Sequence, residues 1–188
     1  GTGTSLRPLF TELVRRHKDE GLSFRNVVVF NLYEFYPLTE GNGSTFGQLN
    51  SLFLSQTDID RQNVFTIDGS IPQNAISEHC RLYEQRIQTF GGIDIVLMGI
   101  GREGNIGMNE PGSHASSPTR LILLDATSRS EAARNWGVDN LPPCSITMGV
   151  QTILSARKIY LLTWGEDKAD IIQKAVEENV NDTLPASF

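Results

Sequence analysis

Two short apolar runs constrain the fold of this chain more than any other feature. They read RNVVVFN at residues 25–31 and IDIVLMGI at residues 93–100, and both are rich in β-branched and aliphatic side chains. A strand with one face in water alternates apolar and polar residues, whereas a strand of a parallel sheet is covered on both faces. The two runs therefore predict buried, parallel strands.

Helical patterns alternate with strand-like runs along the chain. Apolar residues recur at three- and four-residue steps over residues 6–20 and 73–90, and a glycine follows each segment, as is typical of amphipathic helices. The alternation predicts an α/β fold with a doubly wound, mainly parallel sheet, in a single domain over residues 1–188. Ligands of such sheets bind beyond the carboxyl ends of the strands. Further strands are expected at residues 64–67, 119–125, 145–148 and 158–163, and further helices at residues 128–136, 150–154 and 167–179; residues 46–54 form a short apolar-periodic segment.

Composition excludes several classes of function. The chain has 16 Lys and Arg against 22 Asp and Glu, a net charge of −6, which argues against general nucleic-acid binding because that depends on cations. No apolar run approaches the roughly 18 to 20 residues of a membrane-spanning helix. Two cysteines, Cys80 and Cys144, are too few for a disulfide framework or a metal cluster, which favours a reducing, cytoplasmic setting. Because the sequence starts without methionine or a signal-peptide pattern, we expect a longer polypeptide.

The first five residues, Gly1-Thr2-Gly3-Thr4-Ser5, combine small side chains with hydroxyls immediately before a predicted helix. Backbone N–H groups at such a place, together with the positive end of the helix dipole, can bind an anion such as a phosphate. The segment is not a Walker loop, because the lysine of that motif is absent. An ordinary capped helix start behind a flexible terminus explains these residues equally well.

The loop after the second apolar run contains a G-x-G-x-x-G pattern at residues 99–104, and Asp125 follows about 20 residues later. A dinucleotide site is one interpretation. That fingerprint requires a long helix after its third glycine, but residues 105–112 read NIGMNEPG, and the two further glycines and the proline disfavour a helix. A structured loop that lines a pocket is the favoured prediction.

Charged side chains near predicted strand ends are candidates for chemistry. Glu34 could serve as an acid or base, although a carboxylate that accepts hydrogen bonds from backbone N–H groups is the commoner role. Strand alternation places Glu34 on the face opposite Tyr33. Arg120, Arg134 and Lys168 could together neutralise a phosphate, or could simply face water.

Several of these segments, in this order, resemble the motifs of the glucosamine-6-phosphate deaminase/isomerase family, which includes 6-phosphogluconolactonase. The family's phosphate loop, P-T-G-[GS]-[ST]-P, is similar to residues 1–6 (GTGTSL), and its F-N-[ML]-D-E-Y motif is similar to residues 30–35 (FNLYEF). Its signature, G-[VI]-G-x-[DE]-G-H-I-A-F-N-E-P, is similar to residues 99–111 (GIGREGNIGMNEP). Later motifs resemble residues 119–120, 133–136 and 165–169. The resemblance covers essentially the whole chain and implies a Rossmann-like three-layer fold.

The resemblance implies a sugar-phosphate ligand and neither a metal nor an organic cofactor. Family members convert glucosamine 6-phosphate to fructose 6-phosphate and ammonia; an imidazole assists opening of the ring, and a carboxylate moves a proton between C2 and C1. Binding of the remote phosphate orients the reacting carbons. At the matching positions, the phosphate clamp of this chain consists of Thr2, Gly3, Thr4, Ser5, Arg134 and Lys168.

Two catalytic positions depart from the family pattern. Tyr33 stands at the position of the aspartate base and Asn105 at that of the ring-opening histidine, while two acidic positions persist as Glu103 and Glu110. A phenol with a pKa near 10 is protonated at neutral pH, and an amide exchanges no proton with a sugar oxygen. The loss of one general acid or base typically costs about 10² to 10⁴ in rate. We therefore expect hexose-phosphate binding with impaired deaminase catalysis.

Two other functions stay open on the sequence alone. An active deaminase, isomerase or lactonase could use Glu34 or Glu103 as its base. A nucleotide binder would be stabilised against unfolding by NAD(P) and not by sugar phosphates.

The ends of the chain also depart from the resemblance. The family's first strand and its last helices have no counterpart in residues 1–188, so we expect a domain truncated at both ends. The sheet would then have an unpaired edge, which another copy or the absent segments would cover. Family members assemble as homo-oligomers, and we expect the same here, together with an additional domain in the longer chain.

Overall fold

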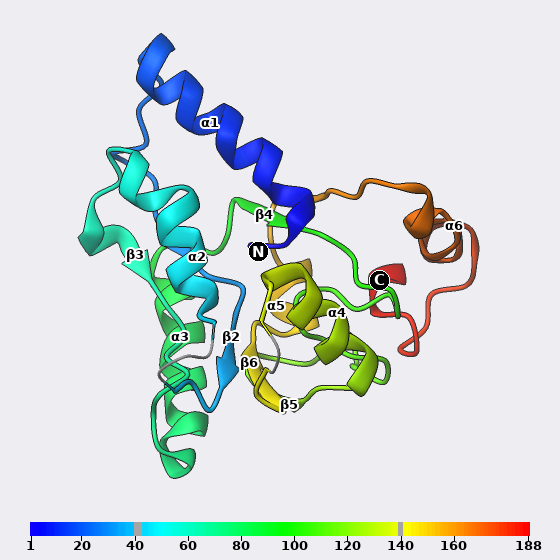
Figure 1. Ribbon diagram of the computed structural model, residues 1–188. Coiled ribbons are helices and arrows are strands. Elements are labelled where there is room, and N and C mark those ends of the chain that lie inside the picture. The colour runs from blue at the N-terminus through cyan, green and yellow to red at the C-terminus, as the bar shows by residue number, and fades with distance from the viewer. Residues whose placement is uncertain (40–42, 139–140) are drawn as a thin grey trace.

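A computed structural model describes residues 1–39, 43–138 and 141–188, and Figure 1 shows its helices packed around short strands. The strands are β1 (Val29–Phe30), β2 (Tyr33–Tyr36), β3 (Val64–Phe65), β4 (Ile95–Met98), β5 (Arg120–Leu123), β6 (Cys144–Thr147) and β7 (Lys158–Leu161). The helices are α1 (Arg7–Glu20), α2 (Thr45–Leu52), α3 (Ile76–Thr89), α4 (Ala126–Trp136), α5 (Val150–Leu154) and α6 (Ala169–Glu177). Short 3-10 turns lie at Thr4–Leu6, Leu54–Gln56, Arg61–Asn63, Gln73–Ala75, Glu166–Lys168 and Pro185–Ser187.

The strands form three hydrogen-bonded groups in the described part of the chain. β1 pairs with β3, and β4 pairs with β7; both pairs are parallel. β6 lies between β2 and β5 and is antiparallel to both. The predicted α/β class is confirmed, but the antiparallel group was not predicted.

The two long helices follow the predicted boundaries closely. Pro8 lies in the first turn of α1, where its missing N–H is not needed. Gly21 ends α1 in the left-handed region, with φ at +73°, a conformation that costs glycine little. The side chains that α3 buries recur at three- and four-residue steps: Ile76, Cys80, Tyr83 and Ile87.

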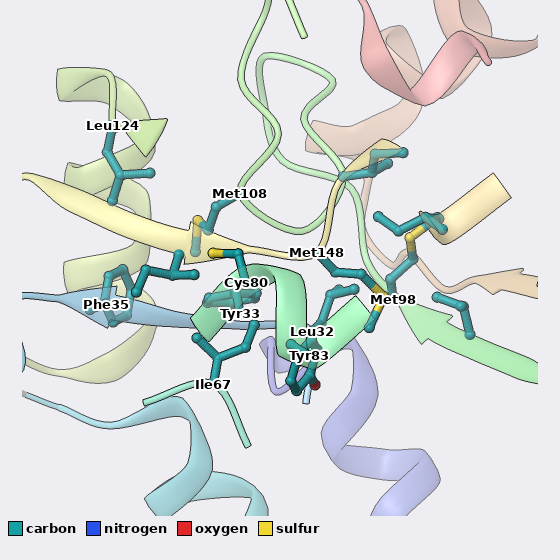
Figure 2. Packing of buried hydrophobic residues seen from close by; sticks show 14 of the residues in the cluster. Leu32, Tyr33, Phe35, Ile67, Cys80, Tyr83, Met98, Met108, Leu124 and Met148 are labelled. Atoms are coloured by element: carbon teal, nitrogen blue, oxygen red, sulfur yellow. The ribbon is translucent and has the colours of Figure 1, made fainter. Parts of the chain in front are cut away.

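The larger apolar core lies between α3 and the strands. Figure 2 shows Tyr33 and Phe35 of β2 in this core with Ile67, and Cys80 and Tyr83 reach it from α3. The Tyr33 and Phe35 rings meet edge to face with centroids 5.9 Å apart, a favourable arrangement of two aromatic rings. The residue that the family pattern would make a catalytic carboxylate is therefore a core aromatic here.

A second core joins α1 to α2 and the segment after it. Phe10 of α1 lies 5.3 Å from Phe53, and Phe24 meets the same ring edge to face at 5.0 Å. These contacts fix α1 and therefore the segment that precedes it.

The first strand is shorter than the sequence predicts. A strand was predicted over residues 25–31, but the parallel pairing of β1 is confined to Val29–Phe30. The Tyr83 hydroxyl donates to the Asn31 carbonyl (2.7 Å), and the Leu32 carbonyl accepts from the Met148 N–H (2.9 Å). These partners redirect the backbone, so that residues 33–36 form a separate strand.

Among the described residues, no helix combines the length and the apolar character that crossing a membrane requires.

Candidate functional site

The N-terminal segment lies at the carboxyl ends of β4 and β7, where a sheet of this class binds its ligands. The Gly1 nitrogen donates to the Leu97 carbonyl (3.0 Å), and the indole N–H of Trp164, just after β7, donates to the Ser5 carbonyl (2.9 Å). In Figure 1 the N-terminus lies next to β4 in the middle of the molecule. Thr2 is buried, whereas Thr4 is exposed.

The candidate clamp cations Lys168 and Arg134 lie on elements that converge on Glu131. The Lys168 ammonium donates to a Glu131 oxygen at 2.7 Å, and the two side chains are only 13% and 17% exposed. Arg134 follows Glu131 by one turn of α4, and both line a cavity of about 350 Å³ together with Arg102. Arg102 also lies 3.6 Å from an Asp167 oxygen.

The structure thus pairs Lys168 with Glu131, places Arg134 in the cavity that Glu131 also lines, and puts Gly1 to Ser5 at the ends of β4 and β7. The sequence interpretation did not select Glu131 or Arg102. The three-residue spacing from Glu131 to Arg134 on a predicted helix was the available signal, because such residues share a face. The pairing of Glu131 with Lys168 joins residues far apart in the chain and leaves no local pattern.

Tyr33 is nearly buried, at 8% exposure, and its phenol points into an apolar setting. Burial raises the pKa of the Tyr33 phenol, and the neighbouring Thr2 hydroxyl offsets only part of that rise. The Tyr33 side chain therefore stays protonated at neutral pH and cannot accept a proton as a carboxylate would.

Glu34 lies on the opposite side of β2 and is 1% exposed. One carboxylate oxygen accepts from the N–H groups of Phe35 (3.0 Å) and Thr45 (2.9 Å), and the other accepts from Phe46 N–H (3.1 Å) and the Ser44 hydroxyl (2.8 Å). Both oxygens are thus engaged at the start of α2, where a negative charge is favourable. This geometry is that of a structural carboxylate that satisfies backbone N–H groups.

The glycine-rich segment at residues 99–112 is a compact loop, as predicted. The Gly101 N–H donates to the Asn105 carbonyl (3.0 Å), and single bridges join Ile106 to Ile100 and Asn109. The next helix in the described chain, α4, begins only at Ala126. The helix that a dinucleotide fingerprint needs after its third glycine is therefore not formed here.

Asn105 lies directly over Gly101 inside this loop. A methyl group on Gly101 would stand 1.8 Å from the Asn105 side-chain oxygen. That oxygen is buried, and within the described residues it has no hydrogen-bond partner. Buried polar atoms normally have a partner, so this amide has unused capacity to accept a hydrogen bond.

Two carboxylates accompany Asn105, and their environments differ. Glu103 is exposed, whereas Glu110 is 6% exposed and accepts from the Ser128 hydroxyl (2.8 Å). The second Glu110 oxygen is buried and has no partner among the residues that the structure describes. Burial is the main cause of a raised Glu110 pKa, and the negative charges of Asp125 and Glu103 raise it further.

Arg120 is tied into the wall of the loop. Its guanidinium donates to the Asn109 side-chain oxygen and to the Ser113 hydroxyl, both at 2.8 Å. Burial lowers the pKa of Arg120. These contacts place Arg120 with the loop that it supports and not with Lys168 and Arg134. Across the described ranges, no group of three or more His, Cys, Asp or Glu side chains is arranged to hold a metal ion.

Comparison with known proteins decides the family. A family model described as "Glucosamine-6-phosphate isomerases/6-phosphogluconolactonase" matches residues 2–188. The chain belongs to this family. The resemblance predicted from the motifs at residues 1–6, 30–35 and 99–111 is thereby confirmed.

Individual relatives support the assignment. The chain is 58% identical over 188 residues to a "Putative glucosamine-6-phosphate deaminase-like protein" of Bacteroides thetaiotaomicron, with 99% of this chain and 28% of that protein covered. It therefore spans little more than a quarter of that relative. It is 36% identical to "Glucosamine-6-phosphate deaminase 1" of Bacillus subtilis, with 99% of this chain and 77% of that protein covered.

Solved structures agree with the fold. A structure described as that of "a monomeric glucosamine-6-phosphate deaminase" superposes with a TM-score of 0.90 at 36% identity, covering 96% of this chain and 75% of that one. The 6-phosphogluconolactonase of Thermotoga maritima superposes with a TM-score of 0.73 at 17% identity, covering 98% and 76% of the two chains. The second match shows the fold alone.

Proposed function

We propose that this chain binds a hexose or amino-sugar phosphate and that its deaminase turnover is weak or absent. One observation carries the proposal: a buried, protonated phenol and an amide stand where the family has its base and its ring-opening group, whereas residues suited to hold a phosphate persist. The phenol belongs to Tyr33 and the amide to Asn105. Binding and proton transfer are thus separated in this site.

The proposed phosphate clamp has an anion-compatible loop and two cations. Thr2 to Ser5 present N–H and hydroxyl groups ahead of α1, and Lys168 and Arg134 supply positive charge from the 3-10 turn Glu166–Lys168 and from α4. In the proposed complex, the sugar phosphate competes with Glu131 for the Lys168 ammonium. Charge-assisted hydrogen bonds of this kind are among the strongest in proteins.

The chemistry of the reacting carbons explains the proposed loss of turnover. A base at the Tyr33 position must take a proton from C2, and a protonated phenol has no capacity for it. Asn105 can accept a hydrogen bond from a sugar hydroxyl through its unpartnered oxygen, but it cannot carry a proton between ring oxygen and water. Asn105 therefore keeps a contact with the ligand, and neither replacement can transfer the proton.

Binding is tested by thermal unfolding of the full-length protein with a panel of phosphosugars, with NAD(P) as the contrasting ligand. A ligand at about 100 times its Kd stabilises the folded state by about 2.7 kcal/mol. Lys168→Met should weaken phosphosugar binding about 10- to 100-fold, as expected for one lost charged contact. Lys174→Met, at an exposed position of α6, is the matched control. Stabilisation by NAD(P) and not by phosphosugars would contradict the proposal.

Catalysis is tested by release of ammonia and fructose 6-phosphate from glucosamine 6-phosphate. The parent should show little turnover, and Tyr33→Asp combined with Asn105→His should raise it. Robust turnover by the parent would instead favour the second candidate function.

That second candidate is an active deaminase, isomerase or lactonase, and Glu110 is the observation that favours it. Its pKa, raised mainly by burial, and its one unpartnered oxygen suit a carboxyl that donates and accepts protons. Glu103 is the exposed carboxylate of the same loop. Glu34 fits the role less well, since both of its oxygens hold the start of α2.

The proposal extends to the setting of the protein. We propose a cytoplasmic protein whose partner is a small sugar phosphate, with further domains in the full-length chain. The Bacteroides thetaiotaomicron relative, of which this chain spans 28%, supports the additional domain. The deaminase structure that superposes with a TM-score of 0.90 is described as monomeric, whereas the family resemblance led us to expect a homo-oligomer. Size-exclusion chromatography with light scattering distinguishes these two states.

A further inference from the structure

Thr163 has a buried hydroxyl that the fold does not use. Its oxygen is buried, and among the described residues no group forms a hydrogen bond with it. A buried hydroxyl without a partner destabilises the folded state, and native proteins rarely keep one. Valine has the same branched shape without this cost. The hydroxyl of Thr163 therefore needs an explanation beyond the packing of the free protein.

Thr163 lies at the carboxyl end of the β4–β7 pair, where sheets of this class bind their ligands. The ladder of these two strands extends past β7 by one bond, from the Leu162 N–H to the Met98 carbonyl (2.8 Å). A Cβ atom on Gly99 would stand 3.5 Å from the Leu162 carbonyl oxygen. Thr163 therefore follows directly beside the start of the glycine-rich loop at residues 99–112.

The alternation of side chains along β7 gives the face on which Thr163 lies. Leu162 packs against the core around α1, whereas Leu161 packs against the larger core. Successive side chains of a strand point to opposite faces. Because the Leu162 bond continues the ladder, Thr163 lies on the face of Leu161, away from α1. Met98 of the neighbouring strand belongs to the same larger core.

A second unpartnered oxygen lies on the adjoining loop. Asn105 lies over Gly101, and its buried side-chain oxygen also lacks a partner in the part of the chain that the structure describes. Gly101 is two residues beyond Gly99, the residue beside Leu162. One ligand group satisfies both oxygens if it donates to Asn105 and accepts from Thr163. A sugar hydroxyl can do both, whereas a fully ionised phosphate has no proton to donate.

We propose that Thr163 is a ligand-binding residue that holds a hydroxyl of the carbohydrate together with Asn105. The Thr163 hydroxyl donates to the sugar oxygen, and the same sugar hydroxyl donates to the side-chain oxygen of Asn105. This contact rests on the proposed function and extends it to the end of the sugar remote from the phosphate. The clamp recognises the phosphate, and Thr163 makes the site selective for a hydroxylated ligand over phosphate alone.

Calorimetry with the full-length protein tests the contact, with glucosamine 6-phosphate and fructose 6-phosphate as probes. Thr163→Val should weaken binding of the phosphosugars at least about fivefold, because it leaves the sugar hydroxyl short of a partner. Thr163→Ser keeps the hydroxyl and should restore most of the affinity. Inorganic phosphate, measured by its competition with the phosphosugar, should bind Thr163→Val and the parent alike. Equal losses for phosphosugar and inorganic phosphate would overturn the proposal.

The same titrations separate this proposal from the proposed function. A parent protein that binds neither phosphosugar would overturn the proposed function and the Thr163 contact with it. A parent that binds a phosphosugar, with unchanged affinity in Thr163→Val, would overturn the Thr163 contact alone.

Stability of the free protein gives a second readout, and Thr152 supplies the matched control. The buried Thr152 hydroxyl donates to a Glu84 carboxylate oxygen (2.5 Å). Thr152→Val should therefore raise the unfolding equilibrium constant at least about tenfold and leave phosphosugar binding unchanged. Thr163→Val should leave the unfolding equilibrium constant unchanged or lower it, because no hydrogen bond is lost. A rise as large as that of Thr152→Val would reveal a structural partner such as a fixed water, and would overturn the proposal.

Discussion

Substitution of the buried Glu34 tests whether its carboxylate has a structural or a catalytic role. It accepts three backbone N–H groups and the Ser44 hydroxyl, and it is 1% exposed. Glu34→Gln preserves the shape of the side chain but exchanges one oxygen for an NH₂ group. The amide oxygen can still accept from Phe35 and Thr45. The NH₂ group then faces the Phe46 N–H, so that two donors oppose each other.

The expected cost follows from these contacts. A hydrogen bond to a charged group contributes about 1.5 to 3 kcal/mol, and a buried N–H left without an acceptor costs about 1 to 3 kcal/mol. The lost charge near the start of α2 adds about 0.3 to 1 kcal/mol. Because the terms overlap, we expect Glu34→Gln to lower the free energy of unfolding by about 3 kcal/mol. Glu34→Ala removes both acceptor oxygens and should cost more.

Urea denaturation followed by circular dichroism measures the effect. With a slope of about 1 to 3 kcal/mol per molar urea, the midpoint should fall by roughly 1 to 3 M. Glu166→Gln, at an exposed position before α6, should leave it unchanged. A Glu34→Gln protein with the parent midpoint would refute the structural assignment, and if the parent turns over a sugar phosphate and this variant does not, Glu34 would be the base of an active enzyme.

Three further experiments test the loop and the clamp. Gly101→Ala should lower the melting temperature, because its methyl group would stand 1.8 Å from the Asn105 oxygen, and adding Asn105→Ala should restore part of the loss. The unfolded chain releases the Glu110 proton near pH 4.5, whereas the folded state keeps it to a higher pH because its pKa is raised. The contribution of Glu110 to the free energy of unfolding should therefore fall as the pH rises from 4.5 through the raised pKa. Denaturation from pH 4 to 8 should show a flatter profile for Glu110→Gln; identical profiles would contradict the raised pKa. Glu131→Gln removes the carboxylate that pairs with Lys168, so it should tighten phosphosugar binding several-fold at low salt and less at high salt. Calorimetry measures this affinity. Weaker binding by the variant would instead assign Glu131 a role in positioning Lys168.

Local patterns in the sequence predicted the elements that local forces determine. The periodic apolar residues of α3 and the glycine after α1 specify those helices within the chain itself. The glycines and Pro111 likewise rule out a helix at residues 105–112. Each of these features is complete within a window of about 15 residues, the scale on which helix propensity and capping act.

Contacts between distant residues were not predictable in the same way. The apolar run at residues 25–31 predicts one strand, yet β1 covers only Val29–Phe30, and tertiary hydrogen bonds to Asn31 and Leu32 separate it from β2. Glu131 and Lys168 are separated in the chain by β6, α5 and β7, so the tertiary fold sets their contact. Periodicity carries no information about such pairs, and the motif resemblance named Lys168 without its partner.

The environment of Tyr33 shows that this position differs from the family pattern in its packing as well as in the missing carboxylate. The Tyr33 ring packs against Phe35 inside the main core, and burial alone favours its protonated form. An aspartate at this position would leave part of that space empty and would itself be desolvated, which raises the pKa of a carboxyl. Tyr33→Asp should therefore lower stability and leave a smaller fraction of the carboxyl ionised at neutral pH than an exposed carboxylate would have. The divergence is thus built into the packing of β2, and the room and polarity around residue 33 should limit the turnover that Tyr33→Asp combined with Asn105→His gains.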